Sequence, residues 1–234
     1  MKNTIIITGG AQRVGLASAL ALHRSGYQVV ITYRRYREKI KELQALGITC
    51  VQADFSQDEG ILFFIEWVKQ NVESLRAIIH NASDWKAESD EADTISLMNQ
   101  MMQIHVQAPY QLNLALKNYF SQSSTGDIIH ITDYTVEKGS EDHIAYCASK
   151  AALANLTLSF ATKYAPTIKV NTIAPSLIIF NQGDTQAYKE ETLSKSLFGI
   201  EPGTQEMVAA IEYILSSDYM TGRTLKLDGG RHLA

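Results

Sequence analysis

The sequence has few of the features that mark secreted, metal-stabilised or membrane proteins. Only two of its 234 residues are cysteine, too few for a disulfide framework or a four-cysteine zinc site. No apolar run approaches the roughly 18 residues that a membrane-spanning helix needs. The apolar start at Ile5–Ile7 is also too short for a signal peptide. These absences favour a reduced protein of the cytoplasm with no membrane partner.

The chain also lacks an excess of positive charge. It has 21 Lys and Arg against 25 Asp and Glu, so nucleic acid is not an expected partner. Hydrophobic residues make up 45% of the chain and charged residues 20%, proportions typical of a folded domain. No repeat and no linker rich in Pro, Gly or Ser divides the sequence. We therefore expect one domain over residues 1–234.

Short apolar segments alternate with longer amphipathic ones along the whole chain. Several short segments are nearly continuous Ile and Val, as in strands buried on both faces of a sheet. The amphipathic segments have helical spacing, as Leu153, Leu156 and Phe160 show within 145–163. This alternation predicts an α/β, Rossmann-like fold, a doubly wound parallel sheet of about seven strands with helices on both faces. The expected strands are Thr4–Thr8, Gln28–Tyr33, Thr49–Ala53, Ala77–His80, Asp127–Thr132, Lys169–Ile173 and Thr224–Leu227.

Residues 175–202 interrupt this alternation. The segment is too long for a simple loop, and it contains a helical pattern near 185–197. Long loops inside compact domains are often functional lids, so we expect a substrate loop here. A plain surface excursion is the alternative.

A glycine-rich turn lies between the first expected strand and a helix. It reads Thr8-Gly9-Gly10-Ala11-Gln12-Arg13-Val14-Gly15. Glycines in such a turn let the backbone approach a pyrophosphate, which binds to N–H groups at the helix N-terminus. Arg13 replaces a glycine of the usual dinucleotide motif, and its guanidinium can bind phosphate or a planar substrate. A structural turn that binds nothing is the alternative.

The second expected strand ends in arginine where NAD-binding proteins usually have an acid. The sequence there is Thr32-Tyr33-Arg34-Arg35. An acid at this place binds the ribose 2′-OH of NAD, whereas arginine favours the 2′-phosphate of NADP. A unit charge pair at about 4 Å is worth roughly 4 kcal/mol at an effective dielectric constant near 20. We therefore predict NADPH as the cofactor, with a solvated basic helix face as the alternative for the arginines and lysines.

Tyr146 and Lys150 form the candidate catalytic pair. They lie four residues apart at the start of a long expected helix, so they share one face of it. A neighbouring ammonium should lower the pKa of the phenol from its usual value near 10, which would favour proton transfer near neutral pH. Tyr134 and Lys138 have the same spacing, but a glycine follows at once and no helix aligns them. Asp133 ends an expected strand at the sheet edge that faces ligands.

The order of these motifs resembles the short-chain dehydrogenase/reductase superfamily from Thr4 to Gly230. Further matching motifs are Asp54, Asn81-Ala82, Asn171, Pro175 and Asp228-Gly229-Gly230. At three positions the sequence resembles the pteridine reductase branch of this superfamily in particular. These are Arg13 in the turn, Asp133 in place of a catalytic serine, and Trp85 at the position of an aromatic residue that stacks on the pterin.

The resemblance implies a role for each site residue. For the cofactor it implies Gly9, Arg13, Val14 and Gly15 at the pyrophosphate, Tyr33 and Arg34 at the ribose phosphate, Asp54 and Phe55 beside adenine, Asn81, Ala82, Ser83 and Lys150 at the nicotinamide ribose, and Pro175, Ser176 and Leu177 at the nicotinamide amide. For the substrate it implies contacts with Arg13, Ser83, Trp85, Asp133 and Tyr146. The implied catalytic residues are Tyr146, Lys150 and Asp133.

The activity implied by the resemblance is NADPH-dependent reduction of 7,8-dihydromonapterin, with weaker reduction of dihydrofolate. Hydride would pass to C6, and N5 would gain a proton from Tyr146 or from a water ordered by Asp133. One alternative is a reductase of another carbonyl, such as a 3-oxoacyl thioester or a sugar, which Trp85 and Asp133 disfavour. A non-catalytic NADP-binding regulator is a second alternative, which the intact Tyr146 and Lys150 disfavour.

Two departures from the family pattern add expectations of their own. His105 replaces an asparagine of a proton relay, so it would either add a pH dependence or serve as a hydrogen-bonded helix residue. Ser176 follows Pro175 where many relatives have glycine. By analogy we expect a homotetramer built through helices near 93–119 and 145–163. The tail 231–234 would reach a neighbour's active site or fray at the terminus.

Overall fold

A computed structural model of the chain describes residues 1–90, 93–120 and 125–234. The strands are β1 (Thr4–Ile7), β2 (Gln28–Tyr33), β3 (Thr49–Gln52), β4 (Leu75–His80), β5 (Gly126–Ile131), β6 (Ile168–Pro175) and β7 (Thr224–Leu227). They form one parallel sheet in the order β3-β2-β1-β4-β5-β6-β7. The expected strands agree with these bounds to within two residues at each end. The predicted doubly wound sheet is therefore confirmed.

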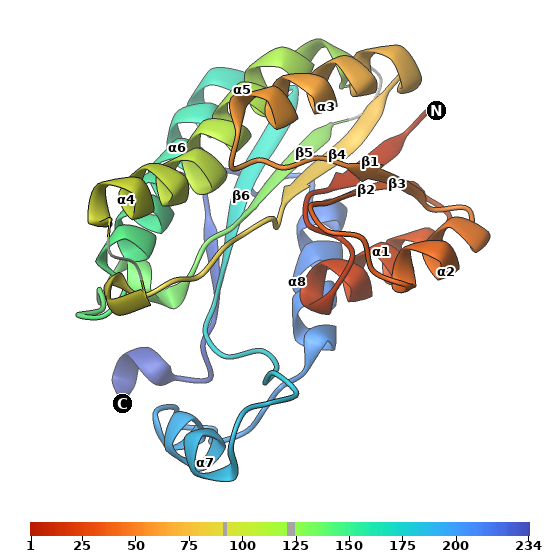
Figure 1. The fold of residues 1–234 in the computed structure, drawn as a ribbon. Helices are drawn as coiled ribbons and strands as arrows, with labels where there is room; N and C mark the ends of the chain where they lie inside the picture. Colours follow the sequence, from red (N-terminus) through yellow and green to blue (C-terminus); the bar gives the residue numbers. More distant parts are fainter. Residues whose placement is uncertain (91–92, 121–124) are drawn as a thin grey trace.

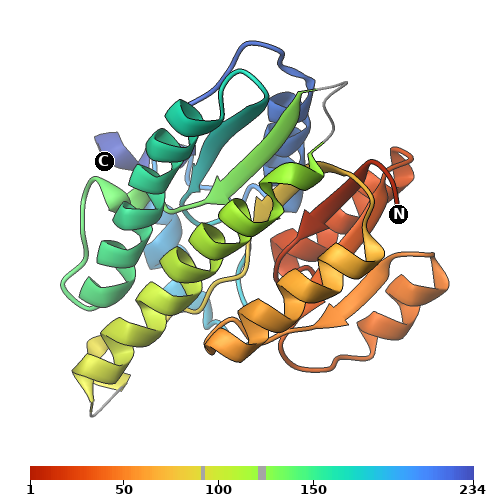
Figure 2. The same ribbon diagram turned by 90° about the horizontal axis from the view of Figure 1, so that it is seen from above.

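Helices cover both faces of this sheet. The α-helices of the described residues are α1 (Arg13–Arg24), α2 (Lys39–Ala45), α3 (Asp58–Asn71), α4 (Thr94–Met102), α5 (Ala108–Leu116), α6 (Ile144–Tyr164), α7 (Gln186–Ser194) and α8 (Thr204–Ser216). Helices α3 to α6 lie on one face, and α1, α2 and α8 lie on the other (Figure 1). Figure 2 shows α6 beside the stretch that contains α4 and α5. Within the described ranges, every helix is too short or too polar to cross a lipid bilayer.

The apolar strands serve two cores at once. Side chains alternate between the faces of a strand, so neighbouring residues of β1 enter different layers. Ile6 packs in the layer with α3, α5 and α6, whereas Ile5 and Ile7 pack in the layer with α1, α2 and α8. All three side chains are fully buried, and burial of each contributes roughly 1.5–3 kcal/mol to stability. This double burial explains why three successive residues of β1 are isoleucine.

The strand order places a crevice at the carboxyl ends of the central strands. β1 pairs with β2 on one side and with β4 on the other, so the chain reverses its winding direction at β1. In doubly wound sheets, ligands bind in the crevice at such a reversal. The loops after β1, β2, β4 and β5 all open onto this edge. The glycine-rich turn, which the sequence predicts to bind the cofactor, is the loop after β1. The predicted catalytic pair, Tyr146 and Lys150, lies at the start of α6.

Most of the segment predicted as a substrate loop lies beyond both helix layers, although Ile178 packs in the layer with α1, α2 and α8. It carries α7, which Figure 1 shows near the C-terminus and beyond the carboxyl ends of the strands. Thr185 caps this helix by accepting a hydrogen bond from the Tyr188 N–H at 3.2 Å. Thr192 is the buried residue of α7, and the other residues of this helix are exposed or half-buried. The helix expected near 185–197 is thus present, and its function as a lid stays a prediction.

A buried ion cluster joins the three strands β4, β5 and β6. Asp127 on β5 contacts Arg76 on β4, and its Oδ1 atom lies 3.0 Å from Nζ of Lys169 on β6. The Asp127 side chain is fully buried, and burial raises its pKa although the two cations oppose this shift. The cluster therefore places three charged groups in a region with little water.

We expect Asp127→Asn to destabilise the protein by about 3–5 kcal/mol, because the variant leaves the buried Lys169 and the partly buried Arg76 without their carboxylate. Urea unfolding monitored by circular dichroism measures this loss. Glu137→Gln is the matched control, since it breaks an exposed ion pair with Lys226 that has an N–O distance of 2.5 Å. The control should lose less than about 1 kcal/mol. Equal losses in the two variants would contradict the assigned role of the cluster.

Candidate active site

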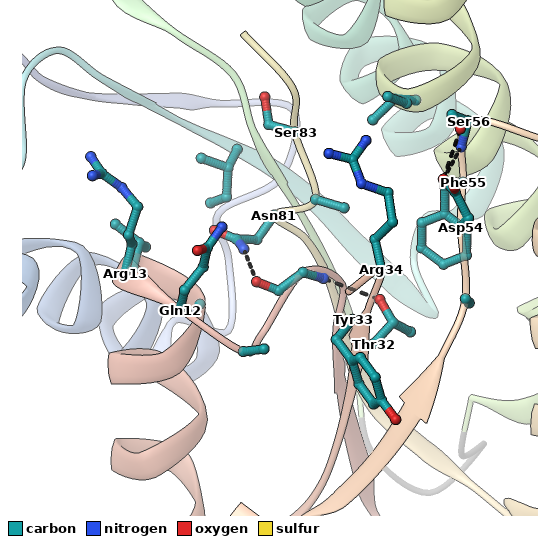
Figure 3. Close-up of a pocket in the computed structure, with 18 of the residues that line it drawn as sticks. Gln12, Arg13, Thr32, Tyr33, Arg34, Asp54, Phe55, Ser56, Asn81 and Ser83 are labelled. Carbon is teal, nitrogen blue, oxygen red and sulfur yellow. Dashed lines mark hydrogen bonds between the residues drawn. The ribbon is translucent and has the colours of Figure 1, made fainter. Parts of the chain in front are cut away.

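A cleft of about 370 Å³ opens at the carboxyl ends of the strands (Figure 3). Residues from the ends of β1 to β6 and from α6 line it. The predicted site residues among them are Gly9, Arg13, Val14, Gly15, Tyr33, Arg34, Asp54, Phe55, Asn81, Ala82, Ser83, Asp133, Tyr146, Lys150 and Pro175. The fold thus gathers into one cleft nearly all the residues that the sequence assigned to cofactor and substrate.

Three of the predicted residues are not part of this lining. Ser176 and Leu177 line a second cavity, of about 430 Å³, between α7 and residues 226–231. The Trp85 side chain is 62% exposed, and its ring stacks on that of His143 with 4.1 Å between the ring centroids. One face of the indole is therefore already covered. Stacking of Trp85 on a pterin stays a prediction.

The turn after β1 brings the backbone close to the bottom of the cleft. Gly9 has a φ of +66°, and a Cβ atom there would lie 2.9 Å from Cα of Ala82. A Cβ atom on Gly15 would lie 2.6 Å from both Nδ2 of Asn81 and the carbonyl oxygen of Gly9. Both positions therefore require glycine. Gln12, the N-cap residue of α1, makes no side-chain capping bond, so helix N–H groups are left for an anion.

Arg13 links this turn to the segment after β6. Its φ is +51°, the left-handed region in which a glycine would be unstrained. The guanidinium donates to Oδ1 of Asn181 at 2.5 Å and to the carbonyl oxygen of Ile179 at 2.9 Å. In Figure 3 its side chain lies on the opposite side of the cleft from Arg34. Arg13 thus holds the segment that leads to α7.

The other end of the cleft is suited to an adenosine phosphate. Arg34, Arg35 and Arg37 line it, as do residues from the end of β3. Asp54 also lies there, and its Oδ1 atom is already engaged, because it accepts hydrogen bonds from the N–H and the hydroxyl of Ser56 at 3.0 and 2.8 Å. The positive charge of the arginines fits the 2′-phosphate that the sequence predicted.

Helix α6 places both residues of the candidate catalytic pair, Tyr146 and Lys150, in the lining of the cleft. The Tyr146 hydroxyl donates to Oδ2 of Asp133 at 3.0 Å, and Lys150 Nζ donates to the carbonyl oxygen of Ile131 at 2.8 Å. Glu88 begins the helix by accepting hydrogen bonds from the first two N–H groups, at 3.0 and 2.7 Å. Tyr134 lies in a short turn and is not among the lining residues of the cleft. The geometry therefore favours Tyr146 over Tyr134 as the candidate, as the sequence predicted.

The prediction that Lys150 lowers the pKa of Tyr146 is wrong for this structure. Burial, followed by the carboxylate of Asp133, raises the pKa of Tyr146 well above 10. Burial also lowers the pKa of Lys150 to about 8, although Asp133 opposes this shift. The ammonium donates to a backbone carbonyl and lies 5.6 Å from the centroid of the Tyr146 ring. Tyr146 is thus held as a neutral phenol that donates its proton to a hydrogen bond.

His105 is a hydrogen-bonded structural residue, as one of the two alternatives expected. It lies on a π-helical turn (Gln103–Gln107) between α4 and α5, and its side chain is buried. Its Nε2 and Nδ1 atoms each lie 2.8 Å from a hydroxyl, that of Ser83 and that of Ser149 respectively. Burial, and then the charge of Lys150, lowers its pKa well below 6.5. The imidazole is therefore neutral, and a pH dependence from its titration near 6.5 is not expected.

Comparison with known proteins agrees with this geometry. A family model described as short chain dehydrogenase matches residues 3–191. The chain belongs to the short-chain dehydrogenase family. Dihydromonapterin reductase from Klebsiella pneumoniae is 52% identical over 231 residues, which cover 98% of this chain and 96% of that relative. The enzyme of the same name from an Enterobacter species is 53% identical with the same coverage.

The fold of this short-chain dehydrogenase is also similar to that of a solved structure. FolM alternative dihydrofolate reductase 1 from Brucella canis, complexed with NADP, is 26% identical to this chain with a TM-score of 0.89. The match covers 99% of this chain and 94% of that one. The similarity therefore includes the loops that form the cleft as well as the sheet.

The buried Lys150 should make the stability of this short-chain dehydrogenase rise with pH. Its pKa is about 8 in the folded protein and near 10.5 in the unfolded chain, so the unfolded chain binds more protons between these values. The free energy of unfolding should therefore increase by about 2 kcal/mol from pH 7 to 9.5 through this group.

Urea unfolding of the wild type and of Lys150→Met at both pH values isolates this contribution. We expect the wild type to gain stability relative to the Met variant. Lys163→Met replaces an exposed lysine near the end of α6 and should follow the wild type. Parallel behaviour of the wild type and Lys150→Met would show that Lys150 keeps an ordinary pKa.

Proposed function

We propose that this protein reduces 7,8-dihydropterins, dihydromonapterin in particular, with NADPH as the electron donor. The observation that carries the proposal is the hydrogen bond between Tyr146 and Asp133 in the same cleft as the glycine turn and Arg34. Two relatives named dihydromonapterin reductase, at 52% and 53% identity, support the substrate class. The NADP complex of the Brucella relative supports the cofactor.

The residues of the cleft suit this cofactor. The helix N-terminus with Gly9, Val14 and Gly15 would hold the pyrophosphate, and Arg34 would hold the 2′-phosphate. The adenine would lie by Asp54 and Phe55, and the nicotinamide ribose by Lys150 with residues 81–83. Residues 175–177 would adjoin the nicotinamide amide. NADPH, when bound, supplies the hydride for C6 of the pterin.

Asp133 favours a substrate that carries N–H groups. Its Oδ1 atom accepts hydrogen bonds from the N–H and the hydroxyl of Thr135 at 2.9 and 2.8 Å, which fixes the carboxylate. Its Oδ2 atom accepts from Tyr146. An ionised carboxylate only accepts hydrogen bonds, so it suits the amino and ring N–H donors of a pterin. A 3-oxoacyl thioester offers no such donor beside its reacting carbonyl.

Tyr146 and Asp133 would together control the proton that N5 gains. While Tyr146 donates to Asp133, its raised pKa makes the phenol a weak acid. A pterin N–H group that takes over Oδ2 of Asp133 would free the Tyr146 hydroxyl from this hydrogen bond, although burial and the charge of Asp133 would still raise its pKa. The hydroxyl would then be available to donate to N5. A water ordered by Asp133 is the other route.

Oxidation of NADPH by the purified protein tests the proposed function. We expect the loss of its absorbance to be fastest with dihydromonapterin, slower with dihydrofolate and slowest with a 3-oxoacyl thioester. NADH in place of NADPH should give a lower rate at the same concentration, because it lacks the 2′-phosphate. Faster turnover of the thioester would overturn the pterin assignment and leave the cofactor site intact.

Tyr146→Phe should lose about 10²- to 10⁴-fold in turnover and keep its affinity for NADPH, because only the proton donor is removed. NADPH fluorescence titration and steady-state rates measure the two effects. Tyr134→Phe is the control, since it removes the other tyrosine hydroxyl with a lysine four residues on. Unchanged turnover in Tyr146→Phe, with a large loss in Asp133→Asn, would assign the proton to a water ordered by Asp133.

The assembly and location of the protein stay predictions. The homotetramer is supported by apolar side chains exposed on α5 and α6, among them Tyr110, Leu114 and Leu158. The cytoplasmic location and the single NADP-binding domain over residues 1–234 rest on the sequence. So does the role of residues 175–202 as the substrate loop.

A further inference from the structure

The arginine predicted to select NADPH is already paired within the protein. Nη1 of Arg34 lies 3.0 Å from Oδ2 of Asp84. Arg34 follows β2 and Asp84 follows β4, and β1 lies between these strands in the sheet. Strand spacing in a sheet is about 4.8 Å, so the pair connects loops whose strands are about 10 Å apart. Figure 3 shows Arg34 extending from the end of β2 toward the segment that carries Ser83.

The carboxylate of Asp84 is held in place by a second group. Gln100 on α4 donates from Nε2 to the same Oδ2 atom at 3.1 Å. Lys86 Nζ donates in turn to Oε1 of Gln100 at 3.3 Å. The Asp84 side chain is 21% exposed and that of Arg34 is 39% exposed, so Asp84 is the more enclosed partner. Asp84 is therefore an acceptor fixed by α4, and Arg34 is the more exposed side chain of the pair.

We infer that Asp84 competes with the cofactor's 2′-phosphate for Arg34 and thereby weakens the binding of NADPH. This inference rests on the proposed function, because it requires NADPH in the cleft. A phosphate that binds Arg34 either draws the guanidinium away from Asp84 or brings a second negative charge next to that carboxylate. Both events oppose binding. NADH has no 2′-phosphate and leaves the ion pair intact, so Asp84 is a specificity-determining residue for the cofactor.

The direction in which NADPH affinity changes when the charge of Asp84 is removed shows whether Asp84 competes with the phosphate for Arg34 or orients Arg34 for it. If Asp84 served to orient Arg34 for the phosphate, removal of its charge would weaken NADPH binding. Arg35 and Arg37 also line this end of the cleft and supply positive charge without Asp84. The phosphate therefore keeps cationic partners when the carboxylate is neutralised, and the loss of repulsion dominates.

Asp84→Asn tests the inference, because it removes the charge and keeps an oxygen for the hydrogen bond from Gln100. Isothermal titration calorimetry gives the Kd of NADPH and of NADH for the wild type and the variant. We expect the Kd of NADPH to fall about two- to fivefold, the range for a partly exposed ion pair, and the Kd of NADH to stay unchanged. In the Arg34→Gln background the same change should tighten NADPH binding less, because the competition for Arg34 is gone and only the repulsion remains.

Glu38→Gln is the matched control. It removes one negative charge four residues after Arg34, from a residue that pairs with Lys41 at 3.3 Å. It should leave both Kd values unchanged. An equal tightening of NADPH binding in this control would mean a general effect of charge and would overturn the inference.

The remaining outcomes distinguish the inference from the proposed function. A wild type that binds NADH as tightly as NADPH overturns the cofactor assignment and the inference with it. A wild type that prefers NADPH, with an Asp84→Asn variant that binds it equally or more weakly, overturns the inference alone. Weaker binding in that case identifies Asp84 as a residue that orients Arg34.

Discussion

The cleft depends on the hydrogen bonds that join the turn after β1 to the segment after β4. The buried Thr8 hydroxyl accepts hydrogen bonds from the N–H groups of Asn81 and Ala82 at 3.0 and 2.9 Å. The side-chain amide of Asn81 donates back to the carbonyl oxygens of Thr8 and Gly9 at 2.9 and 3.1 Å. These four bonds leave no room for a side chain on Gly9 or Gly15. The same contact therefore keeps the turn open to a pyrophosphate and positions the loop that carries Ser83, Asp84 and Trp85.

Electrostatics divide the two ends of this cleft. At the end near β2 and β3, exposed arginines provide positive charge for an anion, and Asp84 neutralises part of it. At the end near α6, burial disfavours the phenolate form of Tyr146 and the ammonium form of Lys150. In the proposed reaction, hydride and proton transfer would thus occur where water is scarce, while the cofactor would be recognised where charge is accessible. The order of the strands in the sheet sets this separation.

Local sequence patterns predicted the fold and most of the cleft because the signals are short in range. The three successive isoleucines of β1 and the glycine turn that follows it can be recognised from neighbouring residues of the chain alone. The pKa of Tyr146 could not be predicted, since burial and the approach of Asp133 depend on how α6 packs on the sheet. The pairing of Arg34 with Asp84 joins residues 50 positions apart. A π-helical turn directs His105 inward, and no sequence pattern marks that turn.

If the cleft brings a reduced nicotinamide to C6 of a dihydropterin, as we propose, the hydride passes directly from NADPH to that carbon. Transfer of a deuterium label reveals this step. NADPH deuterated at both C4 positions of the nicotinamide is incubated with the protein and dihydromonapterin, and the product is examined by mass spectrometry and NMR. We expect one deuterium per tetrahydromonapterin, located on C6. A product that lacks deuterium, or carries it at another carbon, would rule out direct hydride transfer from NADPH to C6.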